Sequence, residues 1–206
     1  METNKILYTV GHSNQTLESF VEEIKSFGID CIVDVRSVPA SKYVPQFNRD
    51  SLQEYLVKEG ISYGHFGYEF GARRNDALDI NNNVDFVKTT KTDAFLQGVE
   101  RIIQGLNSGY KIALMCTESN PLECHRFAMV SRFFHESGIP VCHILAKGSC
   151  KSHEALESAM VAEYVAKRKL PDVDLLFGEY SEEQQLQDAY KLKNKELAFH
   201  VEEFYD

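Results

Sequence analysis

The chain has 206 residues, enough for one domain with a terminal extension, and 43% of them are hydrophobic, enough for a sizeable core. Its formal net charge of −9 at pH 7 argues against a broad nucleic-acid-binding face. No apolar run approaches the ~20 residues of a membrane-spanning helix, and residues 1–5 lack the plan of a signal peptide. We therefore expect no membrane association and a cytoplasmic location.

Short apolar runs that alternate with amphipathic segments predict the fold class. The expected strands are residues 6–10, 31–36, 61–65, a run ending at Cys116, and 141–145. Helical spacing of apolar residues predicts helices that follow the first, second and fourth strands and one over 95–106. This alternation is typical of a three-layer α/β fold, with a mostly parallel sheet and helices on both faces.

The pattern changes near residue 150. Residues 152–169 predict one long helix, and Ser181 to Gln184 form a capping box that begins a final, polar helix. We therefore expect an α/β domain over residues 1–150 and a helical C-terminal extension over 151–206, packed on or beside it. The polar stretch 67–91 is expected to be a lid or a mobile loop that borders the site.

The five cysteines do not suggest a disulfide framework in a chain of this size. Cys31 and Cys142 lie in expected strands, so we predict that they are buried core thiols. Cys150 is expected in a polar loop, with no particular role.

Polar side chains follow three of the expected strands. His12 and Ser13 come after the first strand and Cys116 ends the fourth, while Asp34 and Arg36 close the second. Asn120 and Pro121 then predict a helix start that places Cys124, His125 and Arg126 in the opening turns. Because parallel strands end at one edge of a sheet, these groups are expected to converge there, where α/β proteins bind ligands.

Several short motifs occur in a recognisable order along the chain. They are Thr9-Val10-Gly11-His12-Ser13, Asp34-Val35-Arg36 with Pro39 and Ser41, Phe47-Asn48, Tyr63 with His65, Met115-Cys116-Thr117-Glu118, Cys124-His125-Arg126 and His143-Ile144. Together they resemble the DUF488 family, a domain of unknown function, over roughly residues 6–146. Phe70-Gly71-Ala72 differs from the Leu-Gly-Gly that the family tends to have. The resemblance implies a fold and a set of motifs rather than an activity.

The leading functional prediction is a polar pocket at the sheet edge, belonging to an enzyme that acts on a small anionic or nucleotide-like ligand. The candidate catalytic residues are Cys116, Glu118 and His12. The candidate ligand-binding residues are Ser13, Asp34, Arg36, Ser41, Tyr63, His65, Cys124, His125 and Arg126. Arg36 and Arg126 are expected to bind negative charge as forked donors. No cofactor and no metal site are predicted, because no Cys-x-x-Cys or His-x-x-x-His spacing is present.

Two other functions are left open. One is a non-catalytic module for ligand sensing or protein interaction, in which Asp34 and Arg36 form a structural ion pair. The other is cysteine chemistry like that of rhodaneses and cysteine phosphatases, with Cys116 as the nucleophile. Nine residues, 117–125, separate Cys116 from Arg126, and they include a proline and two carboxylates, unlike the tight anion loop of those enzymes. His143 is interpreted as a satisfied strand histidine, and a homo-oligomer is possible.

Overall fold

A computed structural model describes residues 5–173 and 180–202. Residues 1–4, part of the segment expected not to be a signal peptide, lie outside the described residues. Its centre is a six-stranded sheet in the order β3-β2-β4-β1-β5-β6. The strands are β1 (Leu7–Gly11), β2 (Cys31–Asp34), β3 (Ser62–His65), β4 (Ile112–Cys116), β5 (Val141–Leu145) and β6 (Ser149–Ser152). All neighbouring pairs are parallel except β5 and β6.

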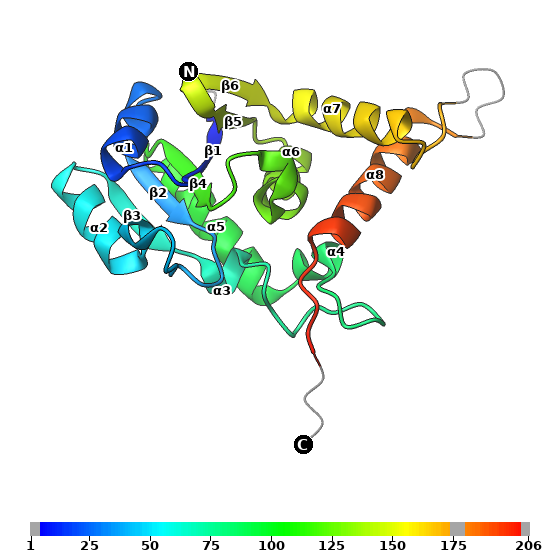
Figure 1. Cartoon of the computed structure of the whole chain (residues 1–206), viewed down its shortest axis with the longest axis horizontal. Coiled ribbons are helices and arrows are strands. Elements are labelled where there is room, and N and C mark those ends of the chain that lie inside the picture. The colour runs from blue at the N-terminus through cyan, green and yellow to red at the C-terminus, as the bar shows by residue number, and fades with distance from the viewer. Residues whose placement is uncertain (1–4, 174–179, 203–206) are drawn as a thin grey trace.

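Helices cover both faces of this sheet, as the sequence predicts (Figure 1). The α-helices are α1 (Leu17–Ser26), α2 (Arg49–Lys58), α3 (Gly67–Phe70), α4 (Phe86–Thr89), α5 (Asp93–Asn107), α6 (Arg132–Glu136), α7 (His153–Ala166) and α8 (Glu182–Leu197). Shorter turns are η1 (Pro45–Phe47), η2 (Pro121–Glu123), the π-helical η3 (Arg126–Ser131) and η4 (Ala146–Gly148). The three-layer α/β prediction is confirmed.

The two layers follow from the alternation of strand side chains. In β2, Ile32 packs with α1 and α2 on one face, whereas Val33 packs with α5 and α6 on the other. Successive strand residues point to opposite faces, so a strand covered on both sides is apolar throughout, as β4 is.

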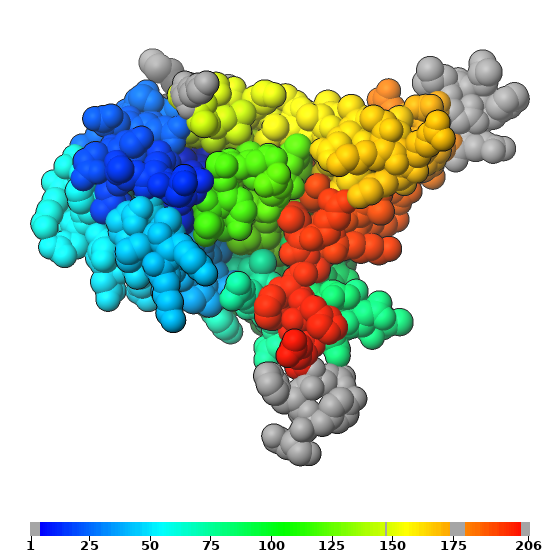
Figure 2. All heavy atoms as spheres, viewed as in Figure 1, coloured from blue at the N-terminus to red at the C-terminus, as the bar shows by residue number. Residues whose placement is uncertain are grey.

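The C-terminal helices α7 and α8 pack against the second of these layers. Leu156 and Met160 of α7 and Ala189 and Tyr190 of α8 belong to the same core cluster as Phe127. In Figure 2, α7 and α8 (yellow to red) lie toward one end of the molecule, and α1 and α2 (blue and cyan) lie toward the other.

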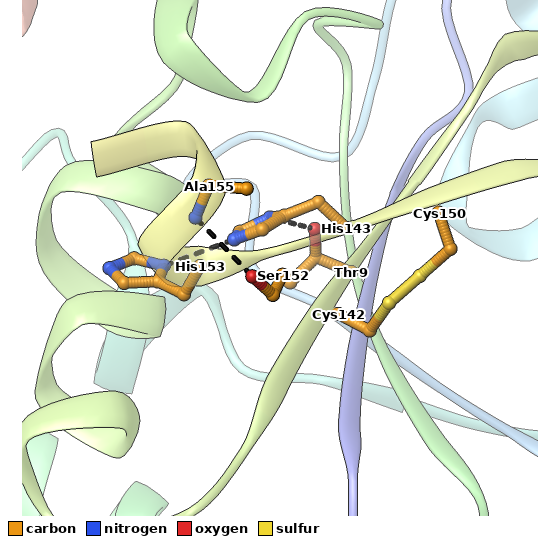
Figure 3. Close-up of a disulfide and its surroundings, with 7 residues drawn as sticks. All are labelled: Thr9, Cys142, His143, Cys150, Ser152, His153 and Ala155. Atoms are coloured by element: carbon orange, nitrogen blue, oxygen red, sulfur yellow. Dashed lines mark hydrogen bonds between the residues drawn. A yellow bond between two sulfur atoms is a disulfide. The ribbon is translucent and has the colours of Figure 1, made fainter. Parts of the chain in front are cut away.

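The hairpin of β5 and β6 corrects the expectation for two cysteines. Cys142 is not a free core thiol, and Cys150 does not lie in a loop: a disulfide joins them across the hairpin (Figure 3). The sequence pattern did not predict β6. Its antiparallel register pairs Ile144 with Cys150 and Cys142 with Ser152, so the two cysteines are diagonal neighbours on one face.

A buried chain of hydrogen bonds joins the sheet to α7 and α8. This histidine chain comprises Thr9, His143, His153, Tyr190 and Glu157, and Figure 3 shows its first three members. Thr9 Oγ1 lies 2.8 Å from His143 Nδ1, and His143 Nε2 lies 3.0 Å from His153 Nδ1. His153 Nε2 lies 2.8 Å from the Tyr190 hydroxyl, which donates to Glu157 at 2.6 Å.

The Tyr190 hydroxyl has one proton, which it donates to Glu157, so its oxygen accepts from His153. This fixes the direction of the remaining hydrogen bonds in the histidine chain. His153 Nε2–H donates to the tyrosine oxygen, and His143 Nε2–H donates to His153 Nδ1. Both histidines are then neutral. Burial is the main cause that lowers the pKa of His153 to about 3 and that of His143 well below its ordinary value. The interpretation of His143 as a satisfied strand histidine agrees with these contacts.

The segment 67–91 is more structured than a polar loop. It contains α3 and α4, and Phe70, Val84 and Phe86 are buried in the core. Residues 79–83 are mostly polar, and this composition suggested a loop. The apolar residues on either side nevertheless anchor the segment on α5 and α8. Only Ala72 and Arg73 of this segment line the cavity described below.

Candidate functional site

The carboxyl ends of β1, β2 and β4 meet at one edge of the sheet. Gly11 pairs with Cys116, and Asp34 pairs with Met115 and His65. Beyond β1 and β4 the contact continues, since the His12 N–H donates to Cys116 O at 3.0 Å. The predicted convergence of the three polar clusters is therefore confirmed.

A cavity of about 530 Å³ opens at this edge. Its lining residues are His12, Arg36, Ser37, Val38, Ala40, Ser41, Val44, Ala72, Arg73, Cys116, Thr117, Glu118, Glu123, Cys124, His125, Leu197, Ala198 and Phe199. Of the predicted site residues, the lining includes His12, Arg36, Ser41, Cys116, Glu118, Cys124 and His125. It does not include Ser13, Asp34, Tyr63, His65 or Arg126.

Asp34 and Arg36 form a buried ion pair on one wall of the cavity. Arg36 Nη2 donates to Asp34 Oδ2 at 2.6 Å, and Nε donates to Oδ1 at 2.9 Å. The Tyr63 hydroxyl donates to Asp34 Oδ2 at 2.8 Å, and Arg36 Nη2 also donates to Phe47 O. Most of the guanidinium donors are thus engaged within the protein, which limits how Arg36 can bind an external anion.

His12 is held by the same network. Its Nδ1 lies 2.8 Å from Ser13 O, its Nε2 lies 3.1 Å from Arg36 Nη1, and its ring stacks on Phe47. Nε2 must be unprotonated to accept from Arg36, so His12 is the neutral Nδ1–H tautomer. Burial, followed by the Arg36 charge, lowers the pKa of His12 to about 4. The expected role of His12 as a catalytic proton carrier does not fit a ring with both nitrogens engaged.

Three other predicted ligand-binding side chains make internal contacts. His65 Nε2 lies 2.8 Å from Arg36 O, and Ser41 Oγ accepts from Tyr43 N at 3.1 Å. Ser13 adopts a positive φ of 48° and donates its N–H to Thr117 O, which fixes the turn after β1. Of these three residues, only Ser41 lines the cavity.

Arg126 is placed differently from the prediction. Its side chain is completely buried, and it donates from Nη1 to Glu118 O at 2.6 Å and from Nη2 to Ser119 O at 3.3 Å. Arg126 therefore holds the loop that carries Glu118 and does not line the cavity, so these contacts do not support the predicted ligand clamp. Gly11 lies under this loop, and a Cβ at Gly11 would come within 1.9 Å of Glu118 O.

The helix expected from Asn120 is interrupted. Asn120 caps η2 by accepting from Leu122 N, but Cys124 is extended, with φ −137° and ψ 140°, and the helical path resumes with η3. The extended backbone brings Cys124 Sγ to the N–H of Arg126 at 3.4 Å. π-helical segments such as η3 are frequent at functional sites.

Four residues form the floor of the cavity, called the cavity floor below: Cys116, Glu118, Cys124 and His125. His125 Nδ1 lies 4.0 Å from Cys116 Sγ and 3.8 Å from Cys124 Sγ. His125 Nε2 lies 3.2 Å from Val35 O, so it carries the proton and leaves Nδ1 facing the sulfurs. Glu118 Oε2 is buried without a hydrogen-bond partner among the described residues.

The two thiols of the floor are electrostatically unlike. The hydrogen bond with Cys124 and burial raise the pKa of the Cys116 thiol well above its ordinary value. Burial alone would raise the pKa of Cys124, but the hydrogen bond with the Cys116 thiol, the Arg126 charge and the adjacent His125 ring lower it well below its ordinary value. Burial and the neighbouring Cys124 raise the pKa of Glu118. The surroundings therefore favour the thiolate form at Cys124 more than at Cys116.

Two parts of the cavity were not predicted from the sequence. Arg73 is exposed at its rim and lies 5.5 Å from the ring of Phe199. No ion pair of Arg73 is found in residues 5–173 and 180–202, unlike Arg74, which binds Asp76. The Arg73-Arg74 pair was the available signal in the sequence. Leu197 at the end of α8 and Ala198 and Phe199 after it also line the cavity, and nothing in the sequence indicated this.

Comparisons with known proteins identify the family. A search of curated proteins and a search of solved structures each returned no match to the chain. In the described ranges, none of the helices has the length and apolar character needed to cross a membrane. The family model "Domain of unknown function DUF488" matches residues 16–133, more than half of the chain and within the span of the motif resemblance. The chain belongs to the DUF488 family.

Proposed function

We propose that the protein is an enzyme that acts on a small anionic compound bound in the cavity at the carboxyl edge of the sheet. The observation that carries the proposal is the composition of that cavity. The same lining holds two thiols, an imidazole and a buried carboxyl together with two arginines. Arg73 has no ion-pair partner among the described residues, and Arg36 is partly engaged by Asp34.

The two networks of the site argue for different roles. Asp34, Arg36 and His12 satisfy one another, which is what a structural module requires. In the cavity floor, by contrast, Glu118 Oε2 has no partner among the described residues, and the contacts of His125 Nδ1 are to sulfur atoms at 3.8 and 4.0 Å. Unsatisfied titratable groups beside a cavity favour an enzyme over a non-catalytic sensing or interaction module.

Arg73 is the best candidate for anion recognition. It has no carboxylate partner among the described residues, whereas Arg36 is neutralised by Asp34 at 2.6 Å. Glu118 and Glu123 also line the cavity, and their carboxyl groups oppose a highly charged anion. We therefore expect ligands with one or two negative charges.

Anion binding is tested by calorimetry with inorganic phosphate and a nucleoside monophosphate. Arg73→Gln should weaken binding roughly 10- to 150-fold, because a charge-assisted hydrogen bond contributes roughly 1.5–3 kcal/mol. Arg168→Gln is the matched control, since Arg168 is exposed and does not line the cavity. Failure of both probes to bind, or equal loss in both variants, would contradict the anion site.

Enzymatic activity is tested with a mixture of small anionic metabolites monitored by mass spectrometry. The protein should convert at least one compound, and Cys124→Ala should not. Cys31→Ala is the control, because Cys31 is also a free thiol but lies outside the cavity. If no compound changes, or if Cys124→Ala converts the same compound, the enzymatic proposal fails.

A second candidate is nucleophilic cysteine chemistry at Cys124 rather than at Cys116. Cys124 Sγ lies 3.8 Å from His125 Nδ1 and receives the Arg126 N–H at 3.4 Å, which is a thiol–imidazole pair at a helix start. Iodoacetamide at neutral pH should then label Cys124 before Cys31. Equal or slower labelling of Cys124 in metal-free protein would exclude this candidate.

A further inference from the structure

The cavity floor gathers three soft or borderline donor atoms around one point. The Sγ atoms of Cys116 and Cys124 and the Nδ1 atom of His125 all lie within 4.8 Å of one another. Zinc binds sulfur at about 2.3 Å and imidazole nitrogen at about 2.0–2.1 Å, so a tetrahedral ion holds such atoms roughly 3.6 Å apart. The observed sulfur–nitrogen separations of 3.8 and 4.0 Å are close to that value.

The surroundings of His125 are those of a metal ligand. Its Nε2 lies 3.2 Å from Val35 O at the end of β2, which fixes the proton there and leaves the Nδ1 lone pair directed at the two sulfurs. Ligating histidines in proteins characteristically donate their other ring nitrogen to a carbonyl or carboxylate. The backbone positions of the sulfurs are also fixed, Cys116 by the β1–β4 register and Cys124 by the extended link between η2 and η3.

Glu118 provides a second, independent indication. Its Oε2 is buried and has no hydrogen-bond partner among the described residues, which is costly for a carboxylate unless something binds it. Glu118 lines the same cavity as the three donors. Its carboxyl can therefore supply a fourth ligand or yield that position to a bound molecule.

We propose that Cys116, Cys124 and His125 bind one zinc ion, with Glu118 or a molecule in the cavity at the fourth position. Thiolate and imidazole ligands select zinc over magnesium or calcium, which require oxygen ligands. Two thiolates so close together would repel each other strongly in a buried site, and a divalent ion neutralises both. Three protein ligands with one position facing a cavity is the arrangement of catalytic zinc.

The catalytic role of the zinc ion rests on the proposed function, whereas zinc binding itself does not. A zinc ion in that position polarises a bound oxyanion or lowers the pKa of a bound water. In the zinc-bound protein Cys124 is a ligand, so the nucleophile candidate applies only to metal-free protein. The anion experiment with Arg73→Gln is independent of the zinc experiment, so either can fail alone.

The test is a zinc titration of the full-length protein after dialysis against a chelator, with a competing chromophoric chelator to report affinity. The expected result is one zinc per chain. We expect zinc binding to weaken by more than about 100-fold in each of the variants Cys116→Ser, Cys124→Ser and His125→Ala. Loss of a residue that only hydrogen-bonds to a ligand typically costs about 10- to 100-fold. Cys31→Ser and His135→Gln should bind like the unaltered protein, because neither residue lines the cavity.

A labelling measurement on the unaltered chain guards against variants that fail to fold. Zinc should protect Cys116 and Cys124 from alkylation and leave Cys31 as reactive as before. Zinc binding that is unchanged in the three ligand variants, or alkylation of Cys116 and Cys124 that zinc does not slow, would overturn the proposal.

Discussion

The histidine chain and the cavity floor are both buried polar clusters built around histidine, yet they are opposite in one respect. In the histidine chain each donor meets an acceptor, from Thr9 to Glu157. In the cavity floor, Glu118 Oε2 has no partner among the described residues, and His125 Nδ1 meets only two sulfurs at 3.8 and 4.0 Å. A satisfied network fixes a structure, whereas an unsatisfied one beside a cavity indicates a missing ligand.

The largest expected effect concerns the support of the cavity floor. Arg126→Ala should lower the free energy of unfolding by about 3–5 kcal/mol, because it empties a large buried volume and leaves the carbonyls of Glu118 and Ser119 without donors. Urea unfolding monitored by circular dichroism measures the loss. Arg168→Ala, at an exposed site, should change stability by less than about 0.5 kcal/mol; a similarly small change for Arg126→Ala would contradict its role in holding the loop.

Breaking the histidine chain should also destabilise the fold, without affecting the cavity. Tyr190→Phe removes the acceptor of His153 and the donor to Glu157, and should cost about 1–3 kcal/mol. Tyr110→Phe is the matched control, because Tyr110 is half-exposed. Differential scanning calorimetry compares the two, and equal melting temperatures would show that the chain contributes nothing.

The histidine chain also predicts a pH dependence. The folded pKa of His153 is about 3, below its ordinary value of about 6.5, so the unfolded chain takes up this proton first. This contribution is complete above pH 6.5 and is lost as the pH falls from 6.5 toward 3. Between pH 7 and pH 5 we expect His153 alone to cost about 2 kcal/mol.

The measurement is urea unfolding of the unaltered protein and of His153→Gln at both pH values. His135, Glu157 and His143 surround His153 and are present in both proteins, so the difference between the two proteins isolates His153. The variant should lose less stability between pH 7 and pH 5. A loss as large as that of the unaltered protein would contradict the neutral state of the chain.

The smallest effect on stability is expected at Glu118, the residue of the cavity floor whose Oε2 lacks a hydrogen-bond partner among the described residues. Glu118→Gln should change the free energy of unfolding by less than about 1 kcal/mol, because its buried Oε2 makes no hydrogen bond to the described residues that could be lost. The same variant should weaken zinc binding measurably. If Glu118→Gln destabilises the protein as much as Tyr190→Phe does, the two clusters do not differ as described here.

The sequence predicted most of what positions the site and less of what the site residues do. Hydrophobic periodicity located the strands, and the expected parallel topology placed their carboxyl ends at one edge of the sheet. This was enough to place His12, Asp34 and Cys116 together. The role of Arg126 could not be predicted, because nothing local distinguishes an arginine that holds a loop from one that faces a cavity. The same holds for Arg73, which reaches the cavity only through the packing of 67–91.

The antiparallel strand β6 was missed for a related reason. Residues 149–152 are polar and short, so they lack the alternating pattern of a strand, and their pairing depends on the neighbouring β5. The metal-binding interpretation was set aside on spacing alone. An extended residue at Cys124 brings together sulfurs eight positions apart in a way that no familiar ligand motif describes.

The central claim is that a zinc ion binds the cavity floor. X-ray absorption at the zinc edge tests this claim most directly. The zinc-loaded protein should show two sulfur neighbours at about 2.3 Å and one or two nitrogen or oxygen neighbours at about 2.0–2.1 Å. In Cys124→Ser one sulfur neighbour should be lost. A spectrum with only nitrogen and oxygen neighbours, or one unchanged in Cys124→Ser, would contradict the claim.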